Sequence, residues 1–331
     1  MTEYANAAGE PVSTGQLVGK GGEGSVYKVS GQPDLVVKVF HDKDIARARK
    51  AKIRAMVANK PRQRTAVDKQ SGKTMPVLTW PEDLVLRGKQ MCGFTMQAVD
   101  MNKSVEIHNV ESIAAREARS WTQRLGLGLR ANIARNLAFL VSQVHSVGAV
   151  IGDFNERNVL VSKNLVVTMI DCDSMQVKDR KGQYHPCEVF QPGFLAPELI
   201  GKSLKTFVRQ PSSDLFCLAV HIYCLLLDRH PFRNGLYPPE LGNKPYNAVL
   251  ARDGQWRGRA GGALRIEKNQ LDPRVFLPPS TLSLFERAFQ AGAENPELRP
   301  SAGQWESELS RFIGAWKPTQ WKTSTLKRRA T

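Results

Sequence analysis

Residues 150–174 read VIGDFNERNVLVSKNLVVTMIDCDS, and this stretch decides how the rest of the chain is interpreted. It contains two short apolar runs with the length and β-branched content of buried strands. The polar residues that flank these two runs are Asp153, Asn158, Asp171 and Asp173. A hairpin of this kind brings carboxylates and an amide to one place. Such a group suits a divalent metal ion and a phosphorylated substrate, because Mg²⁺ prefers one or two carboxylates plus phosphate oxygens.

The composition indicates a globular chain with a strongly basic balance. Its 331 residues are enough for two ordinary domains, or for two lobes that share a cleft. The 47 Lys and Arg residues against 31 Asp and Glu give a net charge of +16, which favours anionic partners. The sequence has no RNA-binding or zinc-finger signature. A nucleic-acid partner is therefore expected only through the basic surface or through a domain outside this sequence.

The five cysteines are scattered and odd in number, which is typical of proteins from a reducing compartment. The sequence begins without the charged-then-apolar pattern of a signal peptide. Its most apolar stretch, residues 215–227, is too short to cross a bilayer. We therefore expect a cytoplasmic protein with no membrane span.

A glycine-rich segment near the beginning has the spacing Gly-x-Gly-x-x-Gly. Glycine lets the backbone approach phosphates closely and turn with positive φ. A dinucleotide-binding turn has the same spacing but continues into a helix, whereas residues 25–29 alternate like a strand. A hairpin with its turn over a nucleotide fits better. The residues expected to bind nucleotide here are Gly19, Lys20, Gly21, Gly22, Gly24 and Val26.

Lys38 lies in the middle of the apolar run 35–40, where an unpaired ammonium group would be costly. A lysine on an edge strand, with its head in water, is the alternative. The glycine-rich hairpin directly before it favours a lysine that pairs with the phosphates of a nucleotide.

These motifs occur in the order found in the eukaryotic-type Ser/Thr protein kinases, and the chain resembles the bacterial branch of that family. The motifs are Gly19-x-Gly21-x-x-Gly24-x-Val26, Val37-Lys38, Asp153-x-x-x-x-Asn158 and Asp171-Cys172-Asp173. Within the branch, the chain looks similar to the kinase of a tellurite-resistance-associated gene triad. That triad also contains a von Willebrand A protein and a PP2C-type phosphatase, which are expected partners beside a protein substrate.

The resemblance implies an α+β, bilobal protein-kinase-like fold. A kinase N-lobe over residues 1–99 would hold a small five-stranded antiparallel sheet and one main helix. A mainly helical C-lobe would span residues 100–314, and residues 315–331 would form a basic tail or linker. Further helices are expected over residues 120–147, 215–227, 281–291 and 301–312.

The resemblance also assigns roles to residues. Asp153 would orient the substrate hydroxyl and accept its proton, and Lys38 would hold the phosphates of ATP. Asn155 stands where the family has a lysine, and its amide would orient a phosphate without supplying charge. Asn158 and Asp171 would bind Mg²⁺ or Mn²⁺. Adenine would bind beside the gatekeeper Met96 and the hinge residues Gln97 and Val99.

Three departures from the family pattern stand out. The helix expected over residues 43–59 lacks the Glu that normally pairs with the lysine, so Lys38 would pair with Asp171 or with a carboxylate from elsewhere. The basic residues of that helix are expected on a solvated surface, with a basic docking face as the alternative. Gly152 replaces the Arg that receives the activation-loop phosphate, so activity is expected without that phosphorylation. Asp173 replaces a glycine, and would either stiffen the segment or bind metal beside Asp171.

Two other functions compete with an active protein kinase. A pseudokinase would use the nucleotide pocket or the basic surface only for binding, and the missing helix Glu favours it. A small-molecule phosphotransferase would share the motifs around Asp153 and Asp171. Three later features favour a protein kinase instead: the Ala-Pro-Glu that ends at Glu198, Asp214 at the start of an apolar helix, and Arg299, expected to pair with Glu198.

Overall fold

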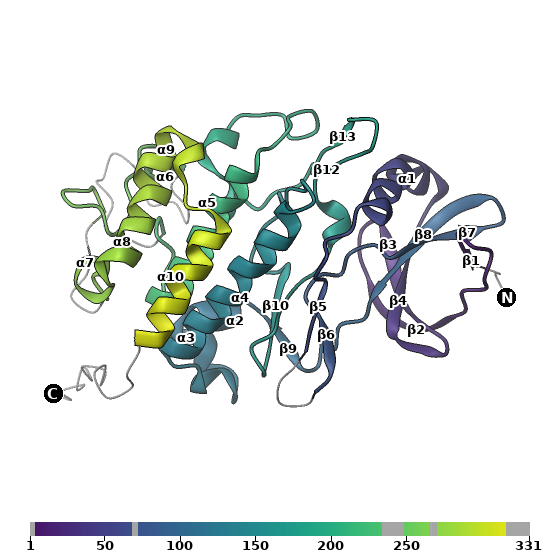
Figure 1. Ribbon diagram of the computed structural model, residues 1–331, viewed down its shortest axis with the longest axis horizontal. Helices are drawn as coiled ribbons and strands as arrows, with labels where there is room; N and C mark the ends of the chain where they lie inside the picture. The colour runs from purple at the N-terminus through teal and green to yellow at the C-terminus, as the bar shows by residue number, and fades with distance from the viewer. Residues whose placement is uncertain (1–3, 68–71, 234–247, 265, 267–269, 316–331) are drawn as a thin grey trace.

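The computed structural model describes residues 4–67, 72–233, 248–264, 266 and 270–315 (Figure 1). A sheet-rich part lies at one end of the molecule and a mainly helical part at the other. This arrangement is the bilobal α+β fold expected from the sequence. From residue 316 onward, the basic tail predicted over 315–331 lies outside the described residues.

The sheet of the first part has six strands in the order β1-β7-β8-β4-β3-β2. Its strands are β1 (Ala5–Asn6), β2 (Thr14–Lys20), β3 (Gly24–Val29), β4 (Gln32–Phe40), β7 (Asp83–Arg87) and β8 (Gln90–Gln97). The prediction of five strands missed β1. That strand contains only two residues, so it has no alternation to recognise.

One long helix, α1 (Lys43–Ala58), packs against this sheet and matches the predicted helix closely. It begins after Asp42, whose carboxylate accepts hydrogen bonds from the backbone N–H groups of Asp44 and Ile45. Ile53 and Met56 are fully buried on its inner side. The helix therefore forms where a good N-cap precedes an apolar stripe.

The segment after α1 contains two short paired strands, β5 (Thr65–Val67) and β6 (Thr74–Pro76). Beyond β6, the backbone N–H of Met169 donates to the carbonyl of Val77. This bond ties the strand pair to the hairpin on which the site is built.

The predicted hairpin forms as β10 (Val159–Ser162) and β11 (Val167–Met169), with β9 (Ser104–Glu106) on the other side of β10. Val159 pairs with Met169, so the residues just before β10 and just after β11 lie at the same end of the hairpin. The strands are fully buried, as their β-branched composition predicted. The polar residues on either side of the hairpin are thereby brought together.

The helical part is organised around α4 (Leu127–His145), which packs on α5 (Pro211–Leu227) and α10 (Ala302–Ala315). The predicted helix over 120–147 begins later, because the backbone at Gly126 is extended and Thr122–Arg124 forms a separate 3₁₀ turn. The shorter helices are α2 (His108–Glu111), α3 (Ile113–Glu117), α6 (Ala248–Arg252), α7 (Pro273–Phe276), α8 (Pro279–Glu286) and α9 (Gly292–Glu294), with a π-helical turn at Arg287–Ala291.

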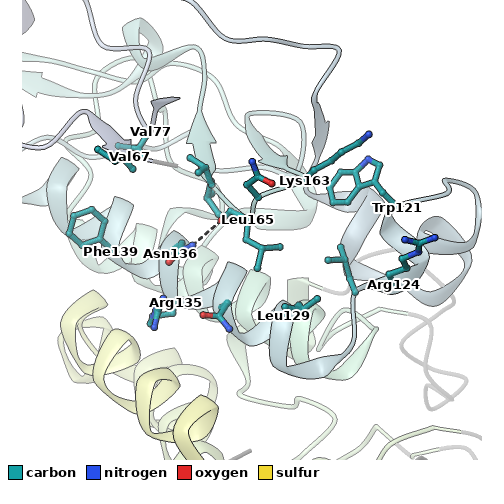
Figure 2. A pocket seen from close by; sticks show the side chains of 16 residues that line it. Val67, Val77, Trp121, Arg124, Leu129, Arg135, Asn136, Phe139, Lys163 and Leu165 are labelled. Carbon is teal, nitrogen blue, oxygen red and sulfur yellow. Dashed lines mark hydrogen bonds between the residues drawn. The ribbon is translucent and has the colours of Figure 1, made fainter. Parts of the chain in front are cut away.

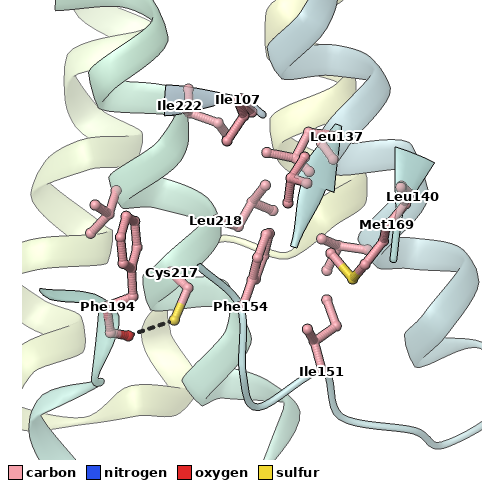
Figure 3. Close-up of a cluster of buried hydrophobic side chains, with 14 of the residues drawn as sticks. Ile107, Leu137, Leu140, Ile151, Phe154, Met169, Phe194, Cys217, Leu218 and Ile222 are labelled. Atoms are coloured by element: carbon pink, nitrogen blue, oxygen red, sulfur yellow. Dashed lines mark hydrogen bonds between the residues drawn. The ribbon is translucent and has the colours of Figure 1, made fainter. Parts of the chain in front are cut away.

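The core of the helical part reaches the segment before β10. Figure 3 shows Ile151 and Phe154 pointing into the same buried cluster as Leu218 of α5. His221 of α5 lies between Phe154 and Phe194, with ring centroids 4.9 Å and 4.6 Å away. Buried side chains on either side of Asp153 thus fix the loop that carries it. Within the described residues, none of the helices is long and apolar enough to cross a bilayer.

Candidate active site

Asp214, in the first turn of α5, holds the loop that carries Asp153. Its buried carboxylate accepts hydrogen bonds from the backbone N–H groups of Ile151 (2.7 Å) and Gly152 (2.9 Å). His145, at the end of α4, lies 2.9 Å from the same carboxylate through Nε2. Asp214 and His145 are therefore structural residues: Asp214 bonds the loop to α5, and His145 of α4 bonds Asp214 in turn.

Asp153 and Asn158 are in direct contact. The side-chain amide of Asn158 donates to the backbone carbonyl and to Oδ2 of Asp153, each at 3.0 Å. Asn155 is buried, and its amide bonds the loop backbone at Asp153 and Arg157. In this geometry Asn155 supports the loop, and the phosphate contact expected for it stays a prediction.

Lys38 forms an ion pair with Asp173, with 2.7 Å between Nζ and Oδ2. Both side chains are largely buried, at 14% and 8% exposure. Burial would lower the pKa of Lys38, but the Asp173 carboxylate outweighs it and the pKa is raised. Gly93 of β8 allows the close approach of β4 here, because a Cβ at this position would lie 2.1 Å from the carbonyl oxygen of Lys38. The partner of Lys38 is thus Asp173, the acid whose role the sequence left open.

Asp171 follows β11 with a left-handed backbone, at a φ of 54°. Non-glycine residues adopt this region rarely, and such strain is concentrated at functional sites. Its side chain is open to the cleft, yet the surrounding protein raises the pKa of its carboxyl by desolvation. The carboxylates of Asp173 and Asp153 add to this increase, while Lys38 opposes it. Negative charge therefore accumulates where the sequence places a metal ion.

Two of the basic residues of α1, Arg49 and Lys52, point into the molecule. Arg49 pairs with Glu23 of the glycine-rich turn at 2.6 Å and contacts Glu188 at 3.5 Å. Lys52 is buried, and its Nζ donates to the carbonyls of Ser174 (2.8 Å) and Pro186 (3.2 Å). The prediction of a solvated surface was therefore wrong for these two residues.

Gly152 has no room for the side chain that the family pattern places there. Its φ is 73°, and an added Cβ would lie 2.8 Å from both the guanidinium of Arg209 and the side chain of Cys187. The buried Arg209 donates to the carbonyl of Val189 at 2.7 Å. The guanidinium of Arg209, from a later segment, thus lies where a side chain of residue 152 would be, and it bonds the backbone at Val189 directly.

These residues enclose a cavity of about 300 Å³. The predicted site residues that line it are Gly21, Gly22, Gly24, Val26, Lys38, Asp153 and Asp171. Glu23, Arg49 and Glu188 also line it and were not predicted as site residues, and Asp173, whose role the sequence left open, lines it as well. None of the predicted loop glycines adopts positive φ. Gly24 is required for close packing, since a Cβ there would lie 2.6 Å from the carbonyl oxygen of Val39.

The other predicted nucleotide residues lie outside the cavity lining. Gly19 and Lys20 end β2, and Met96 and Gln97 end β8. Met96 pairs with Val36 and Gln97 with Leu35, so they lie beside the strand that carries Lys38. Val99 follows the last residue of β8 by two positions. Their contact with adenine stays a prediction.

Glu198 and Arg299 form the predicted pair. The two guanidinium nitrogens of Arg299 each donate to one carboxylate oxygen of Glu198 at 2.7 Å. Arg299 is buried and also donates to the carbonyl of Ser212. This bidentate pair joins the end of the Ala-Pro-Glu segment to the first turn of α5.

The comparison with solved structures shows the class of fold. The structure of the ROP18 kinase domain in complex with AMP-PNP and sucrose matches 94% of this chain and 84% of its own, with a TM-score of 0.55 and 16% identity. The chain therefore has the protein-kinase fold.

Curated proteins show the relationship in sequence. Proteins named protein kinase YegI, from Escherichia coli O157:H7 and from Escherichia coli strain K12, are each 30% identical to this chain over 316 residues. The match covers 92% of this chain and 45% of each relative, so the chain spans about half the length of these relatives. No protein-family model matches the sequence. The chain is thus a homologue of bacterial proteins named as protein kinases.

Proposed function

We propose that this chain transfers the γ-phosphoryl group of ATP to a Ser or Thr hydroxyl of a protein, with Mg²⁺ or Mn²⁺. One observation carries the proposal. The glycine-rich turn, Lys38, Asp153 and Asp171 come from four separate segments and line one cavity. The residues that hold this arrangement, Asp214 and the Glu198–Arg299 pair, are also in place. The homology to proteins named as protein kinases supports the same activity.

The proposed mechanism assigns one task to each group. Asp153 accepts the proton of the attacking hydroxyl, and its orientation is held by the amide of Asn158. Lys38 binds phosphate oxygens from a position fixed by Asp173. The backbone of the glycine-rich turn covers the phosphates. Catalysis of this kind consists mostly of positioning and of charge stabilisation, because the transition state needs little covalent help.

The residues present fit a divalent metal ion. Desolvation raises the pKa of the Asp171 carboxyl, and the carboxylates of Asp173 and Asp153 add to this increase, so negative charge gathers in the cavity. Within the described residues, no group of three or more His, Cys, Asp or Glu side chains is placed to hold a metal ion. Mg²⁺ usually takes one or two carboxylates from the protein and its other ligands from phosphates and water. Asn158 and Asp171 would hold the ion, which when bound would neutralise charge on the phosphates.

We also propose that activity needs no phosphorylation of the segment after Asp171. The contacts of Arg49, Lys52 and Arg209 already bond this segment at Glu188, Ser174, Pro186 and Val189. Between Asp171 and Ala196, only Ser174 and Tyr184 carry hydroxyl side chains. The double variant Ser174→Ala, Tyr184→Phe should keep its activity. A large loss of phosphoryl transfer in that variant would refute the idea.

Transfer of radiolabelled phosphate from ATP to a generic acceptor protein tests the main proposal, with Asp153→Ala as the control. Transfer by the original chain and its loss in the variant are expected. A pseudokinase would bind nucleotide and transfer nothing with either metal ion. The Lys38–Asp173 pair argues against that alternative, because it supplies the acid that α1 lacks.

Cellular context follows from the sequence resemblance and remains part of the proposal. All five cysteines are free thiols, which supports a reducing, cytoplasmic location. A von Willebrand A protein and a PP2C-type phosphatase stay the predicted partners. Co-purification of this chain with a co-expressed von Willebrand A protein or PP2C-type phosphatase would test that prediction.

A further inference from the structure

A second and larger cavity lies on the outward face of α4, away from the active site (Figure 2). Its volume is about 700 Å³, against about 300 Å³ for the active-site cavity, and the two share no lining residue. Its walls come from α4, from the turn between β10 and β11, from the segment around Trp121 and from β5. We call it the α4 groove.

The α4 groove is elongated and has an apolar floor. Figure 2 shows Val67 and Phe139 at one end, Trp121 at the other, and Leu165 between them. Val67 is 64% exposed and Leu129 is 41% exposed, so apolar side chains are available to a partner. An extended segment with apolar side chains at intervals fits this shape better than a compact small molecule.

Leu165 supplies an independent sign of function. It is one of three non-glycine residues with positive φ among the described residues, at 63°. Asn136 of α4 holds it there by donating to its carbonyl at 2.8 Å. A leucine in the left-handed region costs conformational energy that Gly or Asn would largely avoid. Here the strained residue contributes an apolar side chain to the middle of the groove.

The charged residues that line the groove, among those the structure describes, are of one sign. Arg124, Arg135 and Lys163 line it, and no Asp or Glu is among the described residues that do so. Within the part of the chain that the structure describes, none of these three cations has an ion pair. Cations left without partners around an apolar floor are complementary to a segment that combines acidic and apolar residues.

We propose that the α4 groove is a docking site for an acidic segment with apolar side chains, carried by the protein that this chain phosphorylates. The proposal rests on the proposed function. The turn of the β10–β11 hairpin forms one wall of the groove, whereas Asn158 and Asp171 lie at the opposite end of the hairpin. A segment docked in the groove therefore leaves the catalytic cavity open to a hydroxyl elsewhere on the same substrate.

Selection from a phage library of random 12-residue peptides tests the binding without requiring catalysis. The library is panned on the original chain and counter-selected on the variant Arg124→Glu, Arg135→Glu, Lys163→Glu. The enriched peptides should carry Asp or Glu interspersed with Leu, Ile or Phe. Their affinity, measured by fluorescence polarisation, should fall about tenfold or more in the triple variant.

A matched control separates the groove from the general basic charge. Lys28, Arg54 and Lys89 are exposed cations of the sheet-rich part, and replacing all three by Glu changes the net charge equally. That variant should bind the peptides like the original chain. Leu129→Ser, at an exposed position, provides a second groove variant if the triple variant does not fold. Asp153→Ala should bind the peptides like the original chain. A failure of the proposed catalysis would therefore be distinguishable from a failure of docking.

Fusing an enriched peptide to the generic acceptor should lower its KM by tenfold or more while kcat stays unchanged. Three results would overturn the docking proposal. The first is that the selected peptides carry no acidic residues, and the second is that the peptides bind the groove variants as tightly as the original chain. The third is that a labelled 12-nucleotide oligouridine binds the original chain more tightly than the peptides do and that the triple variant loses this binding. The last result would identify the groove as a nucleic-acid site instead.

Discussion

The substitution Asp173→Asn would remove the charge that balances Lys38 while keeping the size of the side chain. The two groups are 2.7 Å apart and largely buried, so the change leaves a cation without its nearest partner. Breaking a buried ion pair from one side costs about 3–5 kcal/mol. The carboxylate of Asp171 also raises the pKa of Lys38 and would replace part of the lost interaction. We therefore expect Asp173→Asn to lower the unfolding free energy by about 3 kcal/mol, the lower end of this range.

The effect on catalysis should be larger than this loss of stability suggests. If Lys38 turns toward Asp171, it leaves the phosphates and also occupies a carboxylate proposed for the metal ion. Removing one positioned charge-stabilising group typically lowers the rate about 100-fold or more. Chemical unfolding followed by tryptophan fluorescence would measure the first effect. Steady-state phosphoryl transfer from ATP would measure the second.

Asp100→Asn provides the matched control, because it makes the same chemical change in the exposed ion pair with Lys103. That pair should contribute less than about 1 kcal/mol. The reasoning would be refuted by an Asp173→Asn protein that is as stable and as active as the Asp100→Asn protein.

Two further predictions concern buried basic groups. Burial lowers the pKa of Lys52 to about 8, below the value of 10.5 expected in the unfolded chain. The unfolded state then binds more protons between these pH values, so the folded state should gain up to about 3 kcal/mol of stability as the pH rises through this window. Lys52→Met should lack that gain, whereas Lys50→Met on the same helix should keep it. The assignment would be contradicted if the unfolding free energy changed with pH in the same way in the original chain and in both variants. Arg299→Leu should lower the unfolding free energy by about 3 kcal/mol, because it leaves Glu198 without its bidentate partner. The exposed Arg274→Leu, which breaks the pair with Asp272, should cost less than about 1 kcal/mol in the same assay.

The parts of the fold that the sequence predicted share a local signal. The β10–β11 hairpin has β-branched runs bounded by polar residues, and α1 has both an N-cap and an apolar stripe. Asp214 and Arg299 were recognised because their motifs follow in a fixed order along the chain. The strands β1, β5 and β6, which the sequence did not predict, have only two or three residues each. Segments of that length carry no periodicity, and their pairing depends on which strands happen to lie nearby.

The acidic partner of Lys38 could not be found from local pattern. Lys38 and Asp173 are 135 positions apart, and their contact depends on the left-handed turn at Asp171. The inward basic residues of α1 did carry a signal. Arg49 and Lys52 follow Ile45 and precede Met56 at spacings of three and four, so they share the helix face of the apolar residues. Their charge suggested that these side chains face solvent, whereas the helical periodicity indicated that they face the interior of the protein.

The distribution of charge around Lys38 has a consequence for regulation. In the family that the sequence resembles, the acid that pairs with the lysine belongs to the main helix, so outward movement of that helix breaks the pair. Here the acid is Asp173, two residues from Asp171 on the same short segment. The position of Lys38 is therefore tied to the proposed metal site itself. The helix makes the opposite contribution, because Arg49 and Lys52 bond the glycine-rich turn and the segment from Ser174 to Glu188. Movement of α1 would then release these two segments first, while the ion pair between Lys38 and Asp173 remained intact.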